Sequence, residues 1–196
     1  MITGLVLAAG LSRRMGTNKL LLPFKERTVL AQIIAVLQAS ALDDIIIVIG
    51  HERDKIEAAA RRHVTQRGGL RFVHNPNYAS GDMLSSIQAG LAAMQDDCSA
   101  ALIVLGDQPQ IERRVVEQVI AAHEPDTVII PSFNRHGGHP ILIDRACWPD
   151  ILALPFGASL RDVWRAHPDW LRYIDVDTET ILRDMDTPDD YRQMVS

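Results

Sequence analysis

The chain has 196 residues, of which 47% are hydrophobic and 23% charged, a composition typical of a packed globular protein. It excludes long disordered, collagen-like or coiled-coil character, and at this length we expect one domain over residues 1–196. Twenty Lys and Arg against twenty-five Asp and Glu give a net charge of −5, which disfavours nucleic acid or an anionic membrane as a partner. Any phosphate site must therefore be a local cationic patch.

Cysteine usage and hydropathy indicate the compartment. Cys98 and Cys147 form neither a CxxC motif nor a dense disulfide pattern, which favours a reducing environment. The apolar stretch Leu5–Leu11 is too short for a secretory signal and has no positive region before it. No apolar run approaches the ~20 residues that a membrane-spanning helix needs. We therefore expect a cytoplasmic protein with no membrane partner.

Strands and helices are predicted to alternate along the chain. Runs rich in Val, Ile and Leu have the length of strands that are buried on both faces; they are Ile2–Leu7, Ile45–Ile49, Ala100–Leu105 and Val128–Ile130. Weaker strands are expected at Arg71–His74, Pro140–Ile143 and Arg172–Val176. Helical periodicity predicts helices over 29–37, Ile56–His63, Met83–Gln95, 115–120 and Leu160–Ala166, and a short helix that begins at Pro188. The alternation predicts an α/β fold, three-layered and Rossmann-like, with a mostly parallel central sheet.

The loop after the first strand carries the strongest chemical signal, because it reads LAAGLSRRMGTNK from residue 7 to residue 19. Its small residues let a ligand approach backbone N–H groups, which bind phosphate oxygens, and its three cations can neutralise much of a triphosphate. The spacing matches neither a Walker loop nor the GxGxxG fingerprint, so it indicates neither a P-loop ATPase nor a nicotinamide dehydrogenase. The residues predicted to bind a nucleotide here are Leu7, Ala8, Ala9, Gly10, Ser12, Arg13, Arg14 and Lys19.

Two acidic segments are candidates for a metal site. Asp107 follows a buried strand in the sequence GDQP, where a carboxylate suits Mg²⁺, and a turn or capping role is an equal alternative. Near the C-terminus, in DMDTPDDY, strand periodicity would turn Asp184 and Asp186 the same way, so one of them could complete a site with Asp107. Asp189 and Asp190 are expected to cap the helix that follows.

Two further loops could contact substrates. The segment NPNYASG leads into a helix that opens with Ser85 and Ser86, and these hydroxyls, with Gly81 before them, could read a base edge or simply cap the helix. His139, in the sequence GGHP, is placed beside two glycines where its imidazole could touch a second substrate.

Five segments, taken in this order, resemble the molybdenum cofactor cytidylyltransferase group of nucleotidyltransferases. They are LAAGLSRRMGTNKLLLPF, NPNYASGDMLSSIQAGL, GDQP, GGHPILI and DMDTPDDY, which together span nearly the whole chain. The related guanylyltransferases typically carry two glycines where this chain has Ala9 and Gly10, so the first loop resembles the cytidine form. The chain departs from the group at Gly81-Asp82-Met83, where relatives more often have Met directly after Gly.

The resemblance implies the nucleotidyltransferase form of the fold and transfer of CMP from CTP to the terminal phosphate of molybdopterin cofactor, with release of pyrophosphate. It implies Mg²⁺ as cofactor, held by Asp107 with Asp184 or Asp186, and Arg14, Lys19 and Asp107 as catalytic residues. Ser85 and Ser86 would approach the base, and His139 the molybdopterin. A molybdenum hydroxylase is the implied recipient of the product.

Two alternatives remain open at this point. One is a cytidylyl- or uridylyltransferase that acts on a sugar phosphate or on methylerythritol phosphate. The other is a non-catalytic factor that delivers the cofactor to a molybdenum hydroxylase. Pyrophosphate release separates the enzymes from the delivery factor, which would bind its ligand without forming a product.

Overall fold

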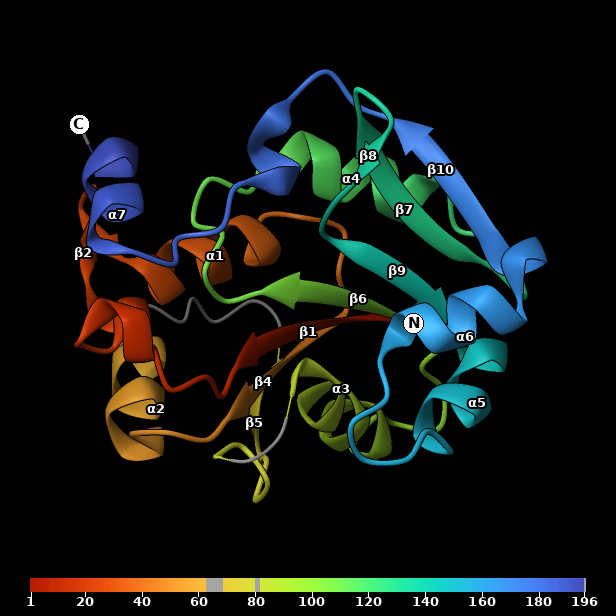
Figure 1. The fold of residues 1–196 in the computed structure, drawn as a ribbon, viewed down its shortest axis with the longest axis horizontal. Helices are drawn as coiled ribbons and strands as arrows, with labels where there is room; N and C mark the ends of the chain where they lie inside the picture. Colours follow the sequence, from red (N-terminus) through yellow and green to blue (C-terminus); the bar gives the residue numbers. More distant parts are fainter. Residues whose placement is uncertain (63–68, 80–81, 196) are drawn as a thin grey trace.

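A twisted eight-stranded sheet forms the centre of the computed structural model, which describes residues 1–62, 69–79 and 82–195 (Figure 1). Its strands follow the order β10-β7-β9-β6-β1-β4-β5, with β8 paired to β7. The bounds are β1 Ile2–Ala8, β4 Asp44–Ile49, β5 Gly69–His74, β6 Ala100–Leu105, β7 Val128–Phe133, β8 His136–Gly137, β9 Ile141–Asp144 and β10 Leu171–Asp175. A separate antiparallel hairpin consists of β2 (Pro23–Phe24) and β3 (Arg27–Thr28).

The sheet is mostly parallel, as predicted. β5, β4, β1 and β6 run parallel to one another, and β10 runs parallel to β7. Only β9 and the short β8 are antiparallel to the strands they pair with. Because β1, β4 and β6 point the same way, their carboxyl ends meet at one edge of the sheet, where open α/β sheets bind ligands.

Helices cover both faces of the sheet, which confirms the three-layer prediction (Figure 1). One layer contains α1 (Val29–Gln38), α2 (Arg53–Arg61) and α4 (Arg113–Ala121), and the other contains α3 (Met83–Ala92), α5 (Trp148–Leu152) and α6 (Leu160–Ala166). Successive strand residues alternate between the two cores: Val6 packs on the α1 side and Leu5 on the α3 side. Both faces are thus apolar, which explains why the strands read as continuous apolar runs.

Several predicted boundaries differ from the structure. β7 continues three residues beyond the predicted Ile130, because pairing with β10 carries the strand through Pro131 and Ser132. α3 ends at Ala92, before the predicted Gln95, because the chain turns there toward the buried Cys98. His63, at the end of one predicted helix, lies outside the described residues. The helix α7 (Pro188–Val195) begins at Pro188 as predicted.

No helix in the described part of the chain is long and apolar enough to cross a bilayer.

Candidate active site

The loop after β1 is held in a fixed shape by its own side chains. Ser12 takes a left-handed backbone conformation with φ at 49°, and its Oγ accepts a hydrogen bond from the Lys19 N–H at 3.3 Å. Asn18 Oδ1 accepts the N–H of Leu20 at 3.2 Å, and the Leu20 side chain is buried in the core. Lys19 therefore sits between a capping residue and a core anchor, which limits where its side chain can reach.

The loop after β6 packs directly on the end of β1. The Gly106 N–H donates to the backbone oxygen of Leu7 at 3.1 Å. A Cβ at position 106 would lie 2.6 Å from that oxygen, so only glycine allows this close approach. Asp107 follows at once and is thereby placed beside the loop of β1.

The acidic segment near the C-terminus reaches the same place through Met185. The Met185 N–H donates to the backbone oxygen of Asp107 at 3.0 Å, and the Met185 side chain is fully buried. The segment is not a strand, so the assumed strand periodicity was wrong, but Asp184 and Asp186 both line the same cavity, as expected. Asp184 accepts a hydrogen bond from Gln108 Nε2 at 2.8 Å, and burial raises its pKa. Asp186 contacts Lys19.

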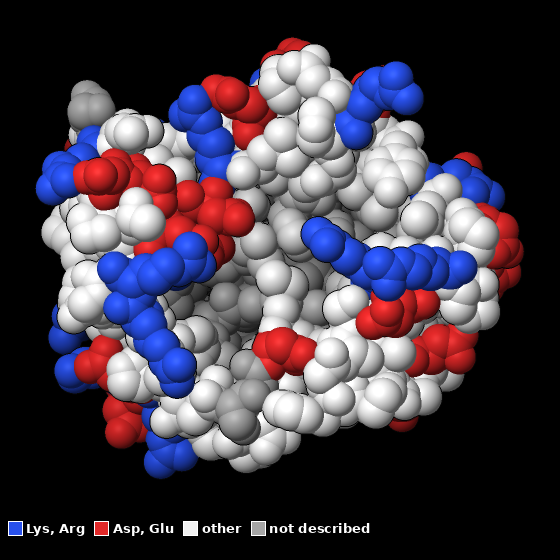
Figure 2. All heavy atoms as spheres, in the orientation of Figure 1, with Lys and Arg blue, Asp and Glu red and all other residues white. Residues whose placement is uncertain are grey.

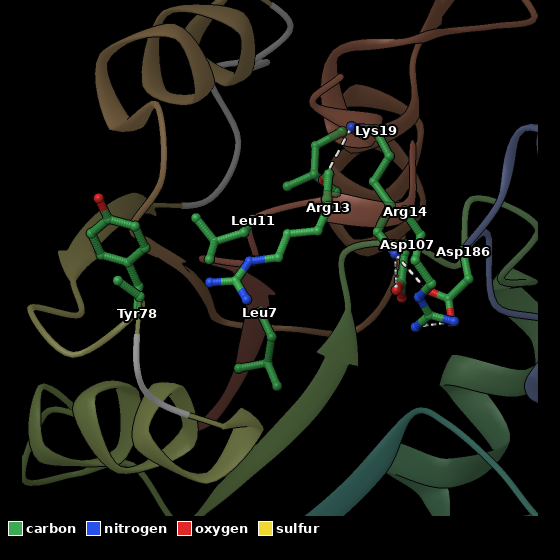
Figure 3. A pocket seen from close by; sticks show the side chains of 12 residues that line it. Leu7, Leu11, Arg13, Arg14, Lys19, Tyr78, Asp107 and Asp186 are labelled. Carbon is green, nitrogen blue, oxygen red and sulfur yellow. Dashed lines mark hydrogen bonds and ion pairs between the residues drawn. The ribbon is translucent and has the colours of Figure 1, made fainter. Parts of the chain in front are cut away.

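Two cations and two carboxylates form one cluster (Figure 3). Lys19 Nζ lies 2.6 Å from Asp107 Oδ2 and 2.9 Å from Asp186 Oδ1, and Arg14 Nη2 lies 2.8 Å from Asp186 Oδ2. The Lys19 side chain is only 14% exposed. Burial by itself lowers the pKa of Lys19, but Asp107 and Asp186 more than offset it, so the pKa is raised and Lys19 stays charged.

The cluster faces a cavity of about 520 Å³, which adjoins a second of about 370 Å³. The residues that line both are Leu7, Gly10, Arg14, Tyr78, Asp107 and Asp186. Arg14 points toward Asp186, whereas Arg13 extends the other way, toward Tyr78 (Figure 3). Figure 2 shows acidic and basic side chains side by side at the rim of a central hollow. A basic, small-residue loop and two acidic loops therefore enclose one space.

Residues 4–170 match the family model of the MobA-like NTP transferase domain. The chain belongs to this family. It is accordingly a nucleotidyltransferase, which argues against the alternative of a non-catalytic delivery factor.

Individual relatives of this MobA-like transferase carry different activities in their names. Molybdenum cofactor cytidylyltransferase of Escherichia coli K12 is 29% identical over 95% of this chain and 92% of its own length. Nicotine blue oxidoreductase of Paenarthrobacter nicotinovorans is 28% identical over the same shares of both chains. Because such different names occur at nearly equal identity, overall likeness alone leaves the substrate to be argued from the site.

Solved structures show the same fold over the full chain. Rv0371c from Mycobacterium tuberculosis H37Rv has a TM-score of 0.83 at 27% identity, and the match covers 99% of this chain and 97% of that one. A nucleotidyl transferase from Methanothermobacter has a TM-score of 0.83 at 26% identity, covering 100% and 96%. Rv0371c was also solved in complex with manganese; that structure matches with a TM-score of 0.75 at 26% identity, covering 99% and 97%.

Most of the residues predicted to bind the nucleotide line at least one of the two cavities of this MobA-like transferase. The residues that do so are Leu7, Ala9, Gly10, Ser12, Arg13, Arg14, Lys19 and Ser86. Ala8 does not, because its side chain packs into the core on the α1 side. Ser85 does not line them either, and Gly81 lies outside the described residues.

The start of α3 is organised by two residues, Asp82 and Asn75, to which the sequence patterns assigned no structural role. Asp82 caps the helix, with its carboxylate accepting the Ser85 N–H at 3.2 Å. The buried Asn75 donates from Nδ2 to Ser85 Oγ at 2.9 Å and to Ser86 Oγ at 3.0 Å. The sequence pattern identified the loop NPNYASG as a candidate substrate contact. It did not distinguish Asn75 from an ordinary turn residue, and it did not indicate that Tyr78 lines the cavity.

His139 lies two residues before β9 and lines a third cavity. Its N–H donates to the Ile181 oxygen at 3.0 Å, and the peptide bond to Pro140 is cis. Burial lowers the pKa of His139 to about 4, although the nearby Asp107 acts in the opposite direction. The imidazole is therefore neutral at physiological pH.

The carboxylates of this site fit a divalent cation in number and placement. Asp107 and Asp186 share the Lys19 ammonium, so oxygens of both already face one positive charge. Mg²⁺ typically binds one or two carboxylates and completes its shell with substrate phosphates and water. Among the described residues, no group of three or more His, Cys, Asp or Glu gathers to form an all-protein metal cage. The arrangement suits a metal that arrives with a nucleotide.

Proposed function

We propose that this MobA-like transferase moves CMP from CTP to the terminal phosphate of molybdopterin cofactor and releases pyrophosphate, in a reaction that requires Mg²⁺. The observation that carries the proposal is the contact of Lys19 with both Asp107 and Asp186, at distances of 2.6 and 2.9 Å, inside a cavity lined by the basic loop. The name of the Escherichia coli relative supports the choice of CTP and molybdopterin. A molybdenum hydroxylase is the proposed recipient of the product.

Asp107 and Asp186 are the proposed metal ligands. Asp186 is preferred to Asp184 because it faces Lys19, whereas Asp184 is held by Gln108 and its pKa is raised by burial. Mg²⁺, when bound, would neutralise charge on the triphosphate and on the departing pyrophosphate. Asp184 is then a neighbour that keeps Gln108 and the acidic segment in place.

Lys19 and Arg14 are proposed to bind the triphosphate. Both are cations within reach of Asp186, and both line the larger cavity. In the reaction, an oxygen of the acceptor phosphate attacks the α-phosphorus of CTP. The bond from that phosphorus to the oxygen bridging to the β-phosphate breaks, and pyrophosphate leaves with the electron pair. The side chains contribute by aligning the two phosphates and offsetting the charge that develops.

No general base is needed for this step, because the attacking oxygen belongs to a phosphate monoester that is already anionic at neutral pH. The neutral imidazole of His139 is consistent with a binding role toward the acceptor. On the nucleotide side, Ala9, Gly10 and Ser86 are proposed to contact the cytosine and ribose, with Ser85 acting indirectly through Asn75.

Identification of the product by mass tests the proposal. The purified chain is incubated with Mg²⁺, either CTP or GTP, and either molybdopterin, a sugar phosphate or methylerythritol phosphate. The expected product is the CMP adduct of molybdopterin, formed with CTP and not with GTP. An adduct that forms only with a sugar phosphate or methylerythritol phosphate would replace the proposed acceptor, and a guanylyl adduct would replace the proposed nucleotide.

A further inference from the structure

Asn75 follows β5 directly and is a buried polar residue whose side-chain amide is fixed in one orientation. The residue is 1% exposed, and its backbone N–H donates to the Ile49 oxygen at the end of β4, at 2.9 Å. Its Oδ1 accepts the backbone N–H of Asn77 at 2.9 Å. Because a backbone N–H can only donate, this contact decides which side of the amide carries the oxygen, and it leaves Nδ2 for the start of α3.

The two protons on Asn75 Nδ2 are both used on serine hydroxyls. Nδ2 lies 2.9 Å from Ser85 Oγ and 3.0 Å from Ser86 Oγ. An amide nitrogen donates and does not accept, so both hydroxyl oxygens act as acceptors here. Each hydroxyl must then donate its own proton elsewhere. Ser85 donates to the backbone oxygen of Asp82 at 2.9 Å.

The hydroxyl proton of Ser86 differs, because within residues 1–62, 69–79 and 82–195 no acceptor lies in hydrogen-bond contact with it. Ser86 lines the smaller of the two cavities beside the charged cluster, about 370 Å³ in volume, whereas Ser85 does not. The side chain of Ser86 is largely buried, and a buried donor without a partner costs free energy. Ser86 therefore presents a hydrogen-bond donor to a molecule in this cavity.

We infer that Asn75 is a positioning residue for the choice of nucleotide, because it holds the Ser86 hydroxyl as a donor toward the base. The inference rests on the proposed function, which places the base against Ser86. The pairing edge of cytosine carries two neighbouring acceptors, N3 and O2. Guanine instead carries two neighbouring donors on its pairing edge, N1–H and the 2-amino group, and a fixed donor leaves them unpaired. Asn75 thereby favours CTP over GTP without contacting either.

Replacing the Asn75 amide by a carboxylate tests the inference, because it inverts the hydrogen-bond polarity at nearly constant shape. In Asn75→Asp both side-chain oxygens accept, so the Ser86 hydroxyl turns its proton toward the carboxylate and offers a lone pair to the base. Calorimetric titration of the full chain, with Mg²⁺ and without an acceptor substrate, measures the affinities for CTP and GTP. The ratio of CTP affinity to GTP affinity is expected to fall about threefold to tenfold, the effect of one hydrogen bond.

Three further variants separate this effect from a change in charge or in folding. Asn77→Asp adds the same charge to the same loop at an exposed position that lines neither cavity, and it should keep the wild-type ratio. Ser86→Ala removes the donor, so it should lower the ratio by itself and tests the inference even where Asn75→Asp does not fold. In the double variant, Asn75→Asp should cause no further fall, because Asn75 acts through the Ser86 hydroxyl.

The inference is overturned if Asn75→Asp or Ser86→Ala keeps the wild-type ratio. An equal loss of CTP and GTP affinity would also overturn it, since that result would leave Asn75 with a purely structural role. So would a fall in Asn77→Asp as large as in Asn75→Asp. Failure of the proposed function is a separate result, namely the absence of a CMP adduct with molybdopterin; a ratio that depends on Asn75 and Ser86 would still support their assignment.

Discussion

Replacing Lys19 by Met keeps a side chain of similar length but removes the ammonium that contacts both Asp107 and Asp186. Each of the two charge-assisted hydrogen bonds is worth roughly 1.5–3 kcal/mol, and removing the ammonium leaves two partly buried carboxylates without their shared cation, although Arg14 still pairs with Asp186. The expected net loss of folding free energy is therefore about 2–4 kcal/mol. Loss of a cation at the triphosphate should lower the rate of transfer by about 10²–10³-fold.

The same substitution should strengthen the binding of a free divalent cation. In the wild-type protein Lys19 already supplies the positive charge between Asp107 and Asp186, so a metal without nucleotide must compete with it. Titration with Mn²⁺, followed by electron paramagnetic resonance in the absence of nucleotide, should show at least about tenfold tighter binding in Lys19→Met. Lys25→Met, at an exposed position, is the matched control. A Lys19→Met protein with wild-type Mn²⁺ affinity and wild-type turnover would refute the reasoning.

Three further predictions concern stability and pH. Gly106→Ala should lower the free energy of unfolding by about 1–3 kcal/mol, because the added Cβ would lie 2.6 Å from the backbone oxygen of Leu7. Gly10→Ala is the control, since no atom of the described chain lies within 4 Å of its Cβ, and it should keep the wild-type melting temperature; equal melting temperatures of the two variants would contradict this. The folded-state pKa of His139, about 4, lies below its unfolded value of 6.5, so the unfolded state takes up the proton first and stability should fall as pH decreases from 6.5 to about 4, by on the order of 3 kcal/mol. Urea titrations should show a flatter pH dependence in His139→Gln, and an unchanged slope would remove this histidine from the explanation. Gln108→Leu should raise the pKa of Asp184 further, because it removes the hydrogen bond that favours the ionised carboxylate. A raised folded-state carboxyl pKa lowers stability as pH rises, so this variant should lose more stability at pH 7 than at pH 4 in urea titrations; an equal loss at both pH values would argue against the Gln108 contact.

The central strands could be predicted from the sequence because they are buried on both faces. Ile45–Ile49 and Ala100–Leu105 are continuous apolar runs, and both form strands, one residue longer at the start in the case of β4. The direction of β9 could not be predicted, because a run of four residues fits a parallel or an antiparallel neighbour equally well. The predicted length of β7 was too short, because it ended before Pro131. In the structure, pairing with β10 continues the strand through this proline, although proline disfavours strands.

The loops of the site could also be recognised, but not the contacts that join them. Residue type and position after a strand pointed to Lys19 and Asp107, whereas only the folded chain shows Met185 bridging to the backbone of Asp107. Asp184 and Asp186 have the same local pattern, and the difference between them comes from their partners. The single domain over residues 1–196 and the cytoplasmic location stay predictions.

Label transfer from CTP tests the central claim most directly. The protein is incubated with Mg²⁺, molybdopterin and CTP carrying ³²P at either the α- or the γ-phosphate. The account predicts that the α-label enters the acceptor product and the γ-label leaves in pyrophosphate, and that Asp107→Asn slows both by about 10²-fold or more. Transfer of the γ-label to the acceptor, or α-label transfer that is unaffected by Asp107→Asn, would contradict it.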